Sequence, residues 1–298
     1  MNQAKNEVFI EGILLESDIQ TGTSKEGKEF IRGELRILVN QKIGDKVIES
    51  IIPVRMFSNK LTKEGKSNKA YESILKVKNE FVSAAAVGGN LEEADAVRIT
   101  SGSLDESLFV PKGSDKEASF PEIQSNFINK ISRDKVVPMT KFNVNVVVNS
   151  IREEIKHEEA TGALILKGAI IQYNDKLDLV DFKIYNEAAK NHIQTNYNKG
   201  DTVNIQGYVN FTSKTEYVEE EQGFGEPILT PKTTTVRELV ITTGSVEPFS
   251  EERAYAREDL NKALSERAAR IVKLKEDSQA AATTPAVPQK GNANDTGF

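Results

Sequence analysis

The run DFKIYNEAAKNHIQTNYNKGDTVNIQGYVN, residues 181–210, passes from strand-like alternation to a helical stretch and back to alternation. Upstream, FNVNVVVNSI (142–151) and GALILKGAIIQY (162–173) predict two strands, and TTVRELVITTGSV (234–246) predicts one strand downstream. Five strands with one helix between the third and the fourth describe a five-stranded OB barrel. A pair of β-sandwiches would also explain the strands, but it would not explain the helix between the third and the fourth strand.

Landmarks of this barrel recur earlier in the chain in the same order. The matched pairs are RITSGSLDE (98–106) with VITTGSVEP (240–248), GKEFIRGELRILV (27–39) with TGALILKGAIIQY (161–173), and PVRMFSNK (53–60) with DFKIYNEA (181–188). The offset between partners differs from pair to pair, which indicates loops of unequal length. A chain of 298 residues also suggests two domains. We therefore expect a mainly β protein with tandem OB folds.

Composition predicts the boundaries of these domains. The segment between the copies is polar and flanked by Pro, and the last residues are small and polar, typical of disorder. Ser250 can cap a helix that carries Leu260, Leu264 and Ile271 at helical spacing. The expected organisation is a first OB fold over 1–110, a linker over 111–138, a second OB fold over 139–249, a C-terminal helix over 250–277 and a disordered tail over 278–298.

Cysteine is absent and only His157 and His192 could offer imidazole, so we expect no metal site and no cofactor. The first ten residues lack the apolar core of a signal peptide, and no apolar run reaches the length of a membrane helix. We expect a cytoplasmic protein, in the host cytoplasm if it is phage-encoded. The net charge of −6 argues against a protein that coats nucleic acid with its whole surface.

Two segments resemble sites of enzymes. GTSKEGK (22–28) matches the start of a phosphate-binding P-loop, but Glu29 replaces the hydroxyl residue that would ligate magnesium. Strands are expected on both sides of it, so the sequence favours a glycine-rich hairpin turn. The acidic run EYVEEEQGFGE (216–226) could coordinate a cation, but such a run is more often a solvated loop. No catalytic residue can be chosen, and we expect no enzymatic activity.

The second and third strands of the first barrel point aromatic and cationic side chains to the same face. Alternation places Val54 and Met56 on one face and Arg55 and Phe57 on the other. The second copy repeats the pattern, with Lys183 and Tyr185 on the outer face. Single-stranded nucleic acid needs this combination, because bases stack on aromatic rings and phosphates need positive charge. The alternative is that each aromatic packs the end of its barrel.

The charge of the chain is unevenly distributed. Residues 25–78 hold 13 Lys and Arg against 7 Asp and Glu, and the excess is sharpest in NKLTKEGKSNK (59–69). Because these lysines follow the strand that carries Phe57, we expect them to contact phosphates. The predicted DNA-binding residues are Phe30, Arg32, Arg36, Arg55, Phe57, Lys60, Lys63, Lys66, Lys69, Lys167, Tyr173, Lys183 and Tyr185.

The run 181–210 resembles the bacterial and phage single-stranded DNA-binding proteins, in which the third strand ends in an aromatic and a helix precedes Lys-Gly-x-x-Val-x-Val-x-Gly. The matching residues are Tyr185, Ala188 or Ala189, Lys199, Gly200, Val203, Ile205 and Gly207. The resemblance implies that Tyr185 stacks on DNA and, through the internal repeat, that Phe57 does so too. The family usually has one OB fold per chain, forms tetramers and is rich in Trp, which this chain lacks. The oligomeric state is therefore left open.

These observations favour a non-enzymatic protein that binds single-stranded DNA with little sequence preference in phage replication or recombination. The alternatives are an assembly or virion protein that uses OB folds for protein–protein contacts, and a barrel that binds RNA or oligosaccharide. The chain ends in NANDTGF, and the resemblance to the acidic, aromatic tips of the family is weak. We hypothesise that residues 278–298 recruit replication or recombination proteins through Asp295 and Phe298.

Overall fold

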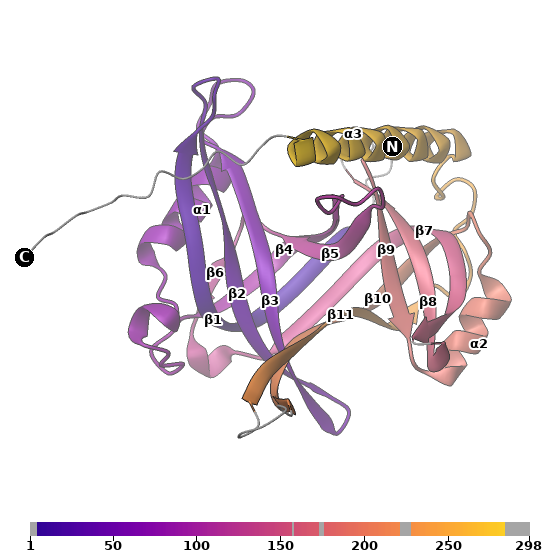
Figure 1. Ribbon diagram of the computed structural model, residues 1–298, viewed down its shortest axis with the longest axis horizontal. Helices are drawn as coiled ribbons and strands as arrows, with labels where there is room; N and C mark the ends of the chain where they lie inside the picture. The colour runs from indigo at the N-terminus through magenta and orange to yellow at the C-terminus, as the bar shows by residue number, and fades with distance from the viewer. Residues whose placement is uncertain (1–4, 157, 173–175, 221–227, 284–298) are drawn as a thin grey trace, which may run out of the picture.

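The computed structural model describes residues 5–156, 158–172, 176–220 and 228–283 of the chain. Figure 1 shows two barrels side by side, with a helix lying across one end of them. The first barrel consists of β1 (Asn6–Thr23), β2 (Glu29–Ile43), β3 (Lys46–Asn59), α1 (Lys69–Glu80), β4 (Ala96–Phe109) and β5 (Ala118–Gln124). Its strand order is β1-β2-β3-β5-β4, and β4 pairs back with β1 to close the barrel. Because β3 and β5 run parallel and α1 follows β3, this is an OB fold.

The second barrel repeats this topology. It consists of β7 (Met139–Lys156), β8 (Glu159–Ile171), β9 (Leu177–Ile184), α2 (Glu187–Asn196), β10 (Thr202–Glu220) and β11 (Ile228–Gly244). The order β7-β8-β9-β11-β10 closes through pairing of β10 with β7, and β9 runs parallel to β11. The prediction of a mainly β chain with two OB folds and a C-terminal helix is confirmed.

The two barrels share one hydrogen-bonded sheet. The start of β1 pairs antiparallel with the start of β7, from Asn6 opposite Val144 to Glu11 opposite Met139. Apolar residues of both barrels, including Ile10 and Val144, belong to one buried cluster. Arg237 of the second barrel also stacks on the ring of Phe120 in β5, 4.5 Å from its centroid. The barrels therefore have a fixed relative orientation.

One pair of sequence landmarks does not mark equivalent positions. The run 98–106 lies in β4, the fourth strand of the first barrel, whereas 240–248 begins at the end of β11, the fifth strand of the second. The run 98–106 lies inside β4, whereas 240–248 runs past the end of β11, so the likeness is one of local composition and not of position. The other two pairs are equivalent, because 27–39 and 161–173 supply the second strands and 53–60 and 181–188 the third.

The predicted linker 111–138 is part of the first barrel. It contains β5, the strand that completes the OB fold, and the short β6 (Asn129–Ile131), and both pair with β4. Ile123 of β5 is fully buried opposite Val54 of β3. The sequence did not indicate β5 as a strand, because β5 is short, lies in a polar segment and has only one fully buried apolar side chain, Ile123. The remaining short elements are the 3-10 turns η1 (Ala85–Val87) and η2 (Arg133–Lys135).

The C-terminal helix begins and ends later than the sequence indicates. Helix α3 spans Arg257–Thr283, whereas Ser250 belongs to a turn in which the Arg253 amide donates to its carbonyl at 2.9 Å. The predicted tail therefore overlaps the last turns of α3, and residues 284–298 lie outside the described residues. Among the residues that the structure describes, no helix combines the length and the apolar character needed to span a membrane.

Helix α3 ties the two barrels together. Its Leu260 and Ala263 pack on Leu177 of the second barrel. One turn further on, Arg267 forms two hydrogen bonds of 2.5 and 3.2 Å with Glu106, a buried carboxylate of β4 in the first barrel. A carboxylate in this position requires a cation, because burying an unpaired charge is costly.

We expect Arg267→Ala to lower the free energy of unfolding by about 3 kcal/mol, because Glu106 would be left buried without its main partner. Lys275→Ala is the matched control, since Lys275 forms an exposed pair with Glu117 at 3.4 Å, and we expect a loss below about 1 kcal/mol. Urea unfolding of both variants measures the difference. Equal losses would show that the helix is not anchored through Glu106.

Candidate nucleic-acid interface

The outer face of β2 and β3 exposes an aromatic ring that contributes little to the core. Val54 and Met56 of β3 are buried, whereas Arg55 and Phe57 point outward and Phe57 is 54% exposed. The alternation expected for this strand is confirmed. More than half of the Phe57 side chain is therefore accessible from the outer face of the barrel.

Phe57 belongs to a small aromatic and cationic surface. The ring of Phe30 in β2 lies 6.0 Å from that of Phe57, and the Arg32 guanidinium is 5.6 Å from the Phe30 ring. Strand pairing produces this arrangement, because Arg32 is directly opposite Phe57 in the β2–β3 register. The Phe57 amide also donates to the side chain of Asn126 at 3.1 Å, which holds this end of the strand. We call Phe30, Arg32 and Phe57 the stacking platform.

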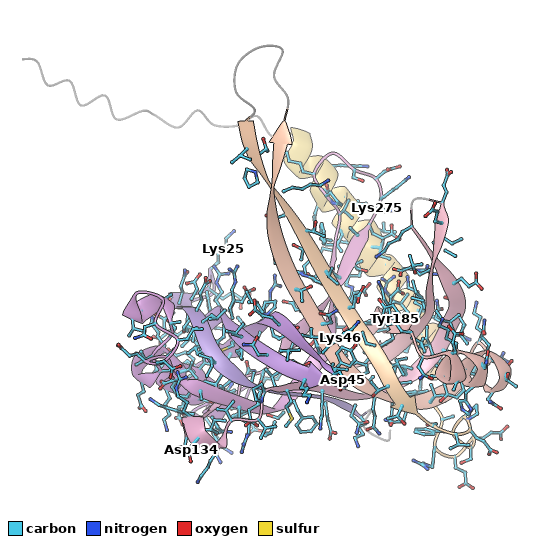
Figure 2. The ribbon with its side chains drawn as sticks, turned by 90° about the horizontal axis from the view of Figure 1, so that it is seen from below. Lys25, Asp45, Lys46, Asp134, Tyr185 and Lys275 are labelled. Carbon is cyan, nitrogen blue, oxygen red and sulfur yellow. The ribbon has the colours of Figure 1, made fainter. Side chains whose placement is uncertain are left out.

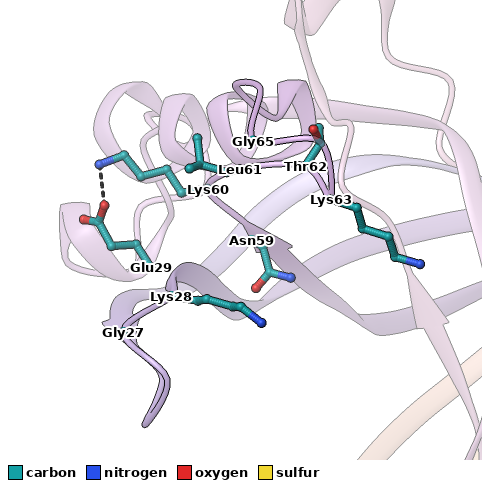
Figure 3. A pocket seen from close by; sticks show the side chains of 9 residues that line it. All are labelled: Gly27, Lys28, Glu29, Asn59, Lys60, Leu61, Thr62, Lys63 and Gly65. Atoms are coloured by element: carbon teal, nitrogen blue, oxygen red, sulfur yellow. Dashed lines mark hydrogen bonds and ion pairs between the residues drawn. The ribbon is translucent and has the colours of Figure 1, made fainter.

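Two hollows adjoin the stacking platform, each of about 510 Å³. The first is lined by Asp18, Gln20, Arg32, Gly33, Glu34, Arg55, Met56, Phe57 and Gln124. The second, shown in Figure 3, is lined by Gly27, Lys28, Glu29, Asn59, Lys60, Leu61, Thr62, Lys63 and Gly65. We call the second hollow the lysine pocket. Since the hollows adjoin opposite ends of the paired β2–β3 segment around Phe30 and Phe57, the three features form one path along the barrel.

Several of the predicted cations already have carboxylate partners. Lys60 is 2.7 Å from Glu29, and this hydrogen bond raises the pKa of Lys60. Arg55 pairs with Glu122 of β5, a largely buried carboxyl whose pKa is raised by burial although Arg55 opposes the shift. Exposed pairs of this kind contribute little and exchange readily with a phosphate, whereas Arg55 also neutralises a buried group.

The other basic residues of the first barrel lie outside the two hollows. Arg36 pairs with Glu16 at 3.2 Å, and Lys66 pairs with Glu64 at 3.2 Å. Lys69 is exposed at the first residue of α1. The structure therefore brings Phe30, Arg32, Arg55, Phe57, Lys60 and Lys63 together, and places Arg36, Lys66 and Lys69 at their margin.

In the second barrel, the equivalent cation is enclosed by carboxylates. Lys183 occupies in β9 the place that Arg55 has in β3, as its pairing with the fifth strand shows. Its ammonium lies 2.8 Å from Glu154 and 2.6 Å from Glu238, and its side chain is only 13% exposed. Burial would lower the pKa of Lys183, but the hydrogen bonds to both carboxylates outweigh burial and raise it.

Tyr185 takes the place of Phe57 and is 46% exposed. Its hydroxyl lies 3.1 Å from Glu238, and burial together with that carboxylate raises the pKa of Tyr185 to about 12. Lys167 lies 4.0 Å from Asp181, which also binds Arg152 at 3.1 Å. Figure 2 labels Tyr185 on the second barrel and Lys25 on the first, well separated in that view. An aromatic ring is thus exposed on both barrels, but on the second the cation beside the ring is enclosed by two carboxylates.

Sequence reasoning missed part of the lysine pocket. Lys28 follows Gly27 in the run that resembles a P-loop, and the structure confirms a hairpin turn there, because β1 ends at Thr23 and β2 begins at Glu29. Gly27 has a φ of +77°, which favours glycine. Asn59, the residue opposite Phe30, was also missed. The basic composition of both loops was the signal that could have indicated them.

Tyr173, Asp295 and Phe298 lie outside the described residues. Of the acidic run 216–226, the first five residues continue β10 and the others also lie outside the described part.

We expect Lys183→Met to lower the free energy of unfolding by about 3 kcal/mol near neutral pH, because it removes the cation of Glu238 and leaves Glu154 with only Lys156, at 3.4 Å. Burial would raise the pKa of Glu154, but hydrogen bonds from Lys183 and Thr161 hold it below the ordinary 4.5. A depressed carboxyl pKa stabilises the fold above about pH 4.5, and this contribution is lost as the pH falls through the folded-state pKa.

The loss in free energy of unfolding that Lys183→Met causes should therefore be smaller at about pH 3 than at about pH 7. Lys167→Met is the control, because its exposed contact at 4.0 Å should contribute less than about 1 kcal/mol. Chemical unfolding at several pH values gives both comparisons. A deficit that stays constant with pH would contradict the role of the carboxylates.

Comparison with known proteins gives a family match and distant structural similarities. The wild-type single-stranded DNA binding protein from Thermus aquaticus has 14% identity and a TM-score of 0.48, covering 85% of this chain and 97% of that chain. A deletion mutant of the Thermus aquaticus protein has 12% identity and a TM-score of 0.48, covering 87% and 100%. At this level of similarity, function has to be argued from the residues of this chain. No curated protein matches the sequence. The model of the YorF family matches residues 5–277, and the chain therefore belongs to the YorF family.

Proposed function

We propose that this protein binds single-stranded DNA along the outer face of the first barrel, with little sequence preference and without catalysis. The observation that supports this most is the stacking platform between two hollows that contain cations. Phe57 is 54% exposed, its ring is 6.0 Å from that of Phe30, and Arg32 lies beside them. Such a surface offers stacking to unpaired bases and positive charge to the backbone between them.

The chemistry of the site favours an unpaired strand over a duplex. Aromatic rings can stack only on bases whose faces are accessible, and in a duplex neighbouring base pairs cover those faces. The platform contains few groups that could read base edges, so we expect contacts with any sequence. Most of the cations lie on loops and strand ends around the platform, where they can contact phosphates without being buried.

The second barrel has a lesser part in this proposal. Tyr185 can stack on a base because 46% of it is exposed, but Lys183 is committed to Glu154 and Glu238. A further carboxylate, Asp181, would repel a phosphate at that face. We therefore expect removal of the Tyr185 ring to weaken DNA binding less than removal of the Phe57 ring.

A role in phage replication or recombination is the finer form of the same proposal. It would require partners, and we propose that the residues after α3 recruit them through Asp295 and Phe298. Since α3 ends at Thr283, the matching truncation begins at residue 284 and leaves the helix intact. Loss of a partner with an unchanged DNA isotherm would support this role.

The primary test is the affinity of the protein for a fluorescent oligo-dT strand, compared with single-stranded RNA and a duplex of equal length. We expect the unpaired DNA to bind most tightly and its affinity to fall steeply with salt, because bound phosphates release counterions. Absence of binding at low salt would refute the proposed function. Tighter binding of RNA would instead assign the site to RNA.

Phe57→Ala should weaken binding of oligo-dT by about 1–3 kcal/mol through loss of stacking, while the melting temperature stays nearly unchanged because the ring is exposed. Phe109→Ala is the control, because Phe109 is also an exposed ring, 39% accessible, but lines neither hollow. Fluorescence anisotropy and thermal melts on both variants separate binding from folding. A lowered melting temperature with unaltered affinity would return Phe57 to a packing role.

A further inference from the structure

The first barrel contains the same five-residue turn twice. SKEGK occupies residues 24–28 between β1 and β2, and TKEGK occupies residues 62–66 between β3 and α1. Both segments place a hydroxyl residue first, lysines second and fifth, and a glycine fourth. This repeat is independent of the duplication of the barrels, because both copies lie in the first barrel.

The two turns also have the same backbone structure. In the first, the Ser24 amide donates to the Lys28 carbonyl at 2.8 Å and the Gly27 amide to the Ser24 carbonyl at 2.9 Å. In the second, the Thr62 amide donates to the Lys66 carbonyl at 2.8 Å and the Gly65 amide to the Thr62 carbonyl at 2.9 Å. Both glycines have a φ of +77°. The hydroxyl of the first residue also accepts from the fifth amide in each turn.

The turns face each other across the lysine pocket. The pairing with β2 extends one residue past the end of β3, because the Lys60 amide donates to the Glu29 carbonyl at 2.9 Å, and this places the second turn beside the first. The pocket is lined by Lys28, the fifth residue of the first turn, and by Lys63, the second residue of the other. Lys25 and Lys66, the remaining lysines of the two turns, do not line it.

The two lining lysines are available to an anion. Figure 3 shows Lys28 and Lys63 extending in the same direction, whereas Lys60 points the other way toward Glu29. Lys28 has one partner, Glu26 at 2.8 Å, but both side chains are at least 70% exposed and such a pair is weak. Lys63 has no ion-pair partner among the residues that the structure describes. Among the described residues that line the pocket, Glu29 is the only carboxylate, and Lys60 neutralises it.

We propose that the lysine pocket binds a backbone phosphate of the single strand between the two turns, with Lys28 and Lys63 as its ligands. This inference rests on the proposed function and adds a fixed phosphate position to it. A phosphodiester carries one negative charge and two free oxygens, so one ammonium from each turn can bind one oxygen. Asn59, which also lines the pocket, adds a neutral amide donor.

The pocket lies at a useful distance from the stacking platform. Asn59 is two residues beyond Phe57 on β3, about 7 Å along an extended strand, and is paired with Phe30. A nucleotide whose base stacks on Phe30 or Phe57 thus has its backbone within reach of the pocket. The single-stranded DNA would then be bound at two neighbouring places on the β2–β3 hairpin, by base stacking on the platform and by a phosphate contact in the pocket.

The repeat provides a matched control for testing this site. The pocket variant Lys28→Gln/Lys63→Gln and the control variant Lys25→Gln/Lys66→Gln remove the same charge from the same two turns. Only the first pair lines the pocket. Binding of oligo-dT is measured by anisotropy over a range of salt concentrations, and a thermal melt of each variant checks folding.

We expect the pocket variant to bind about tenfold more weakly at low salt and to lose about 0.7 from the magnitude of the slope of log K against log salt, the value for one phosphate. The control variant should show less than half of this loss in affinity and less than half of this change in slope. Phe57→Ala should lose affinity with an unchanged slope. Equal losses in the two double variants would overturn the pocket but leave DNA binding intact, whereas absence of binding by the unchanged chain would overturn both.

Discussion

The antiparallel pairing between β1 and β7 holds the two barrels in one molecule. It joins two closed barrels into one sheet, from Asn6 opposite Val144 to Glu11 opposite Met139. Each of these two strands also closes its own barrel, because β1 pairs with β4 and β7 pairs with β10. Rotation of one barrel against the other would break hydrogen bonds in a buried region, which is costly. Helix α3 strengthens the junction through Arg267 and Glu106.

Two barrels of the same topology have acquired different surfaces. The third strand of each carries a cation two residues before an exposed aromatic ring: Arg55 before Phe57 within β3, and Lys183 before Tyr185, which directly follows β9. In the second barrel, Glu154 and Glu238 enclose the lysine, and the tyrosine hydroxyl contacts one of them. A shared fold therefore does not imply a shared function, since neighbouring side chains decide whether a charge is available.

The candidate site follows from strand geometry more than from any single motif. Because side chains alternate along β2 and β3, burying Ile31 and Val54 necessarily exposes Arg32 and Arg55. The sequence pattern was therefore sufficient to predict which face would carry Phe57. It was insufficient to predict the lysine pocket, because the two turns are separated by the length of two strands and meet only through the β2–β3 register.

Local sequence was enough to predict the two OB folds, the alternation that exposes Phe57 and Tyr185, and the existence of a C-terminal helix. These features depend on local periodicity and on the order of strands and helices along the chain. The tertiary structure alone decided that β5 belongs to the first barrel, that the runs 98–106 and 240–248 occupy different strands, and that Lys183 is enclosed by carboxylates. Each of these depends on strand pairing or on charges brought together from distant segments, which no local pattern records.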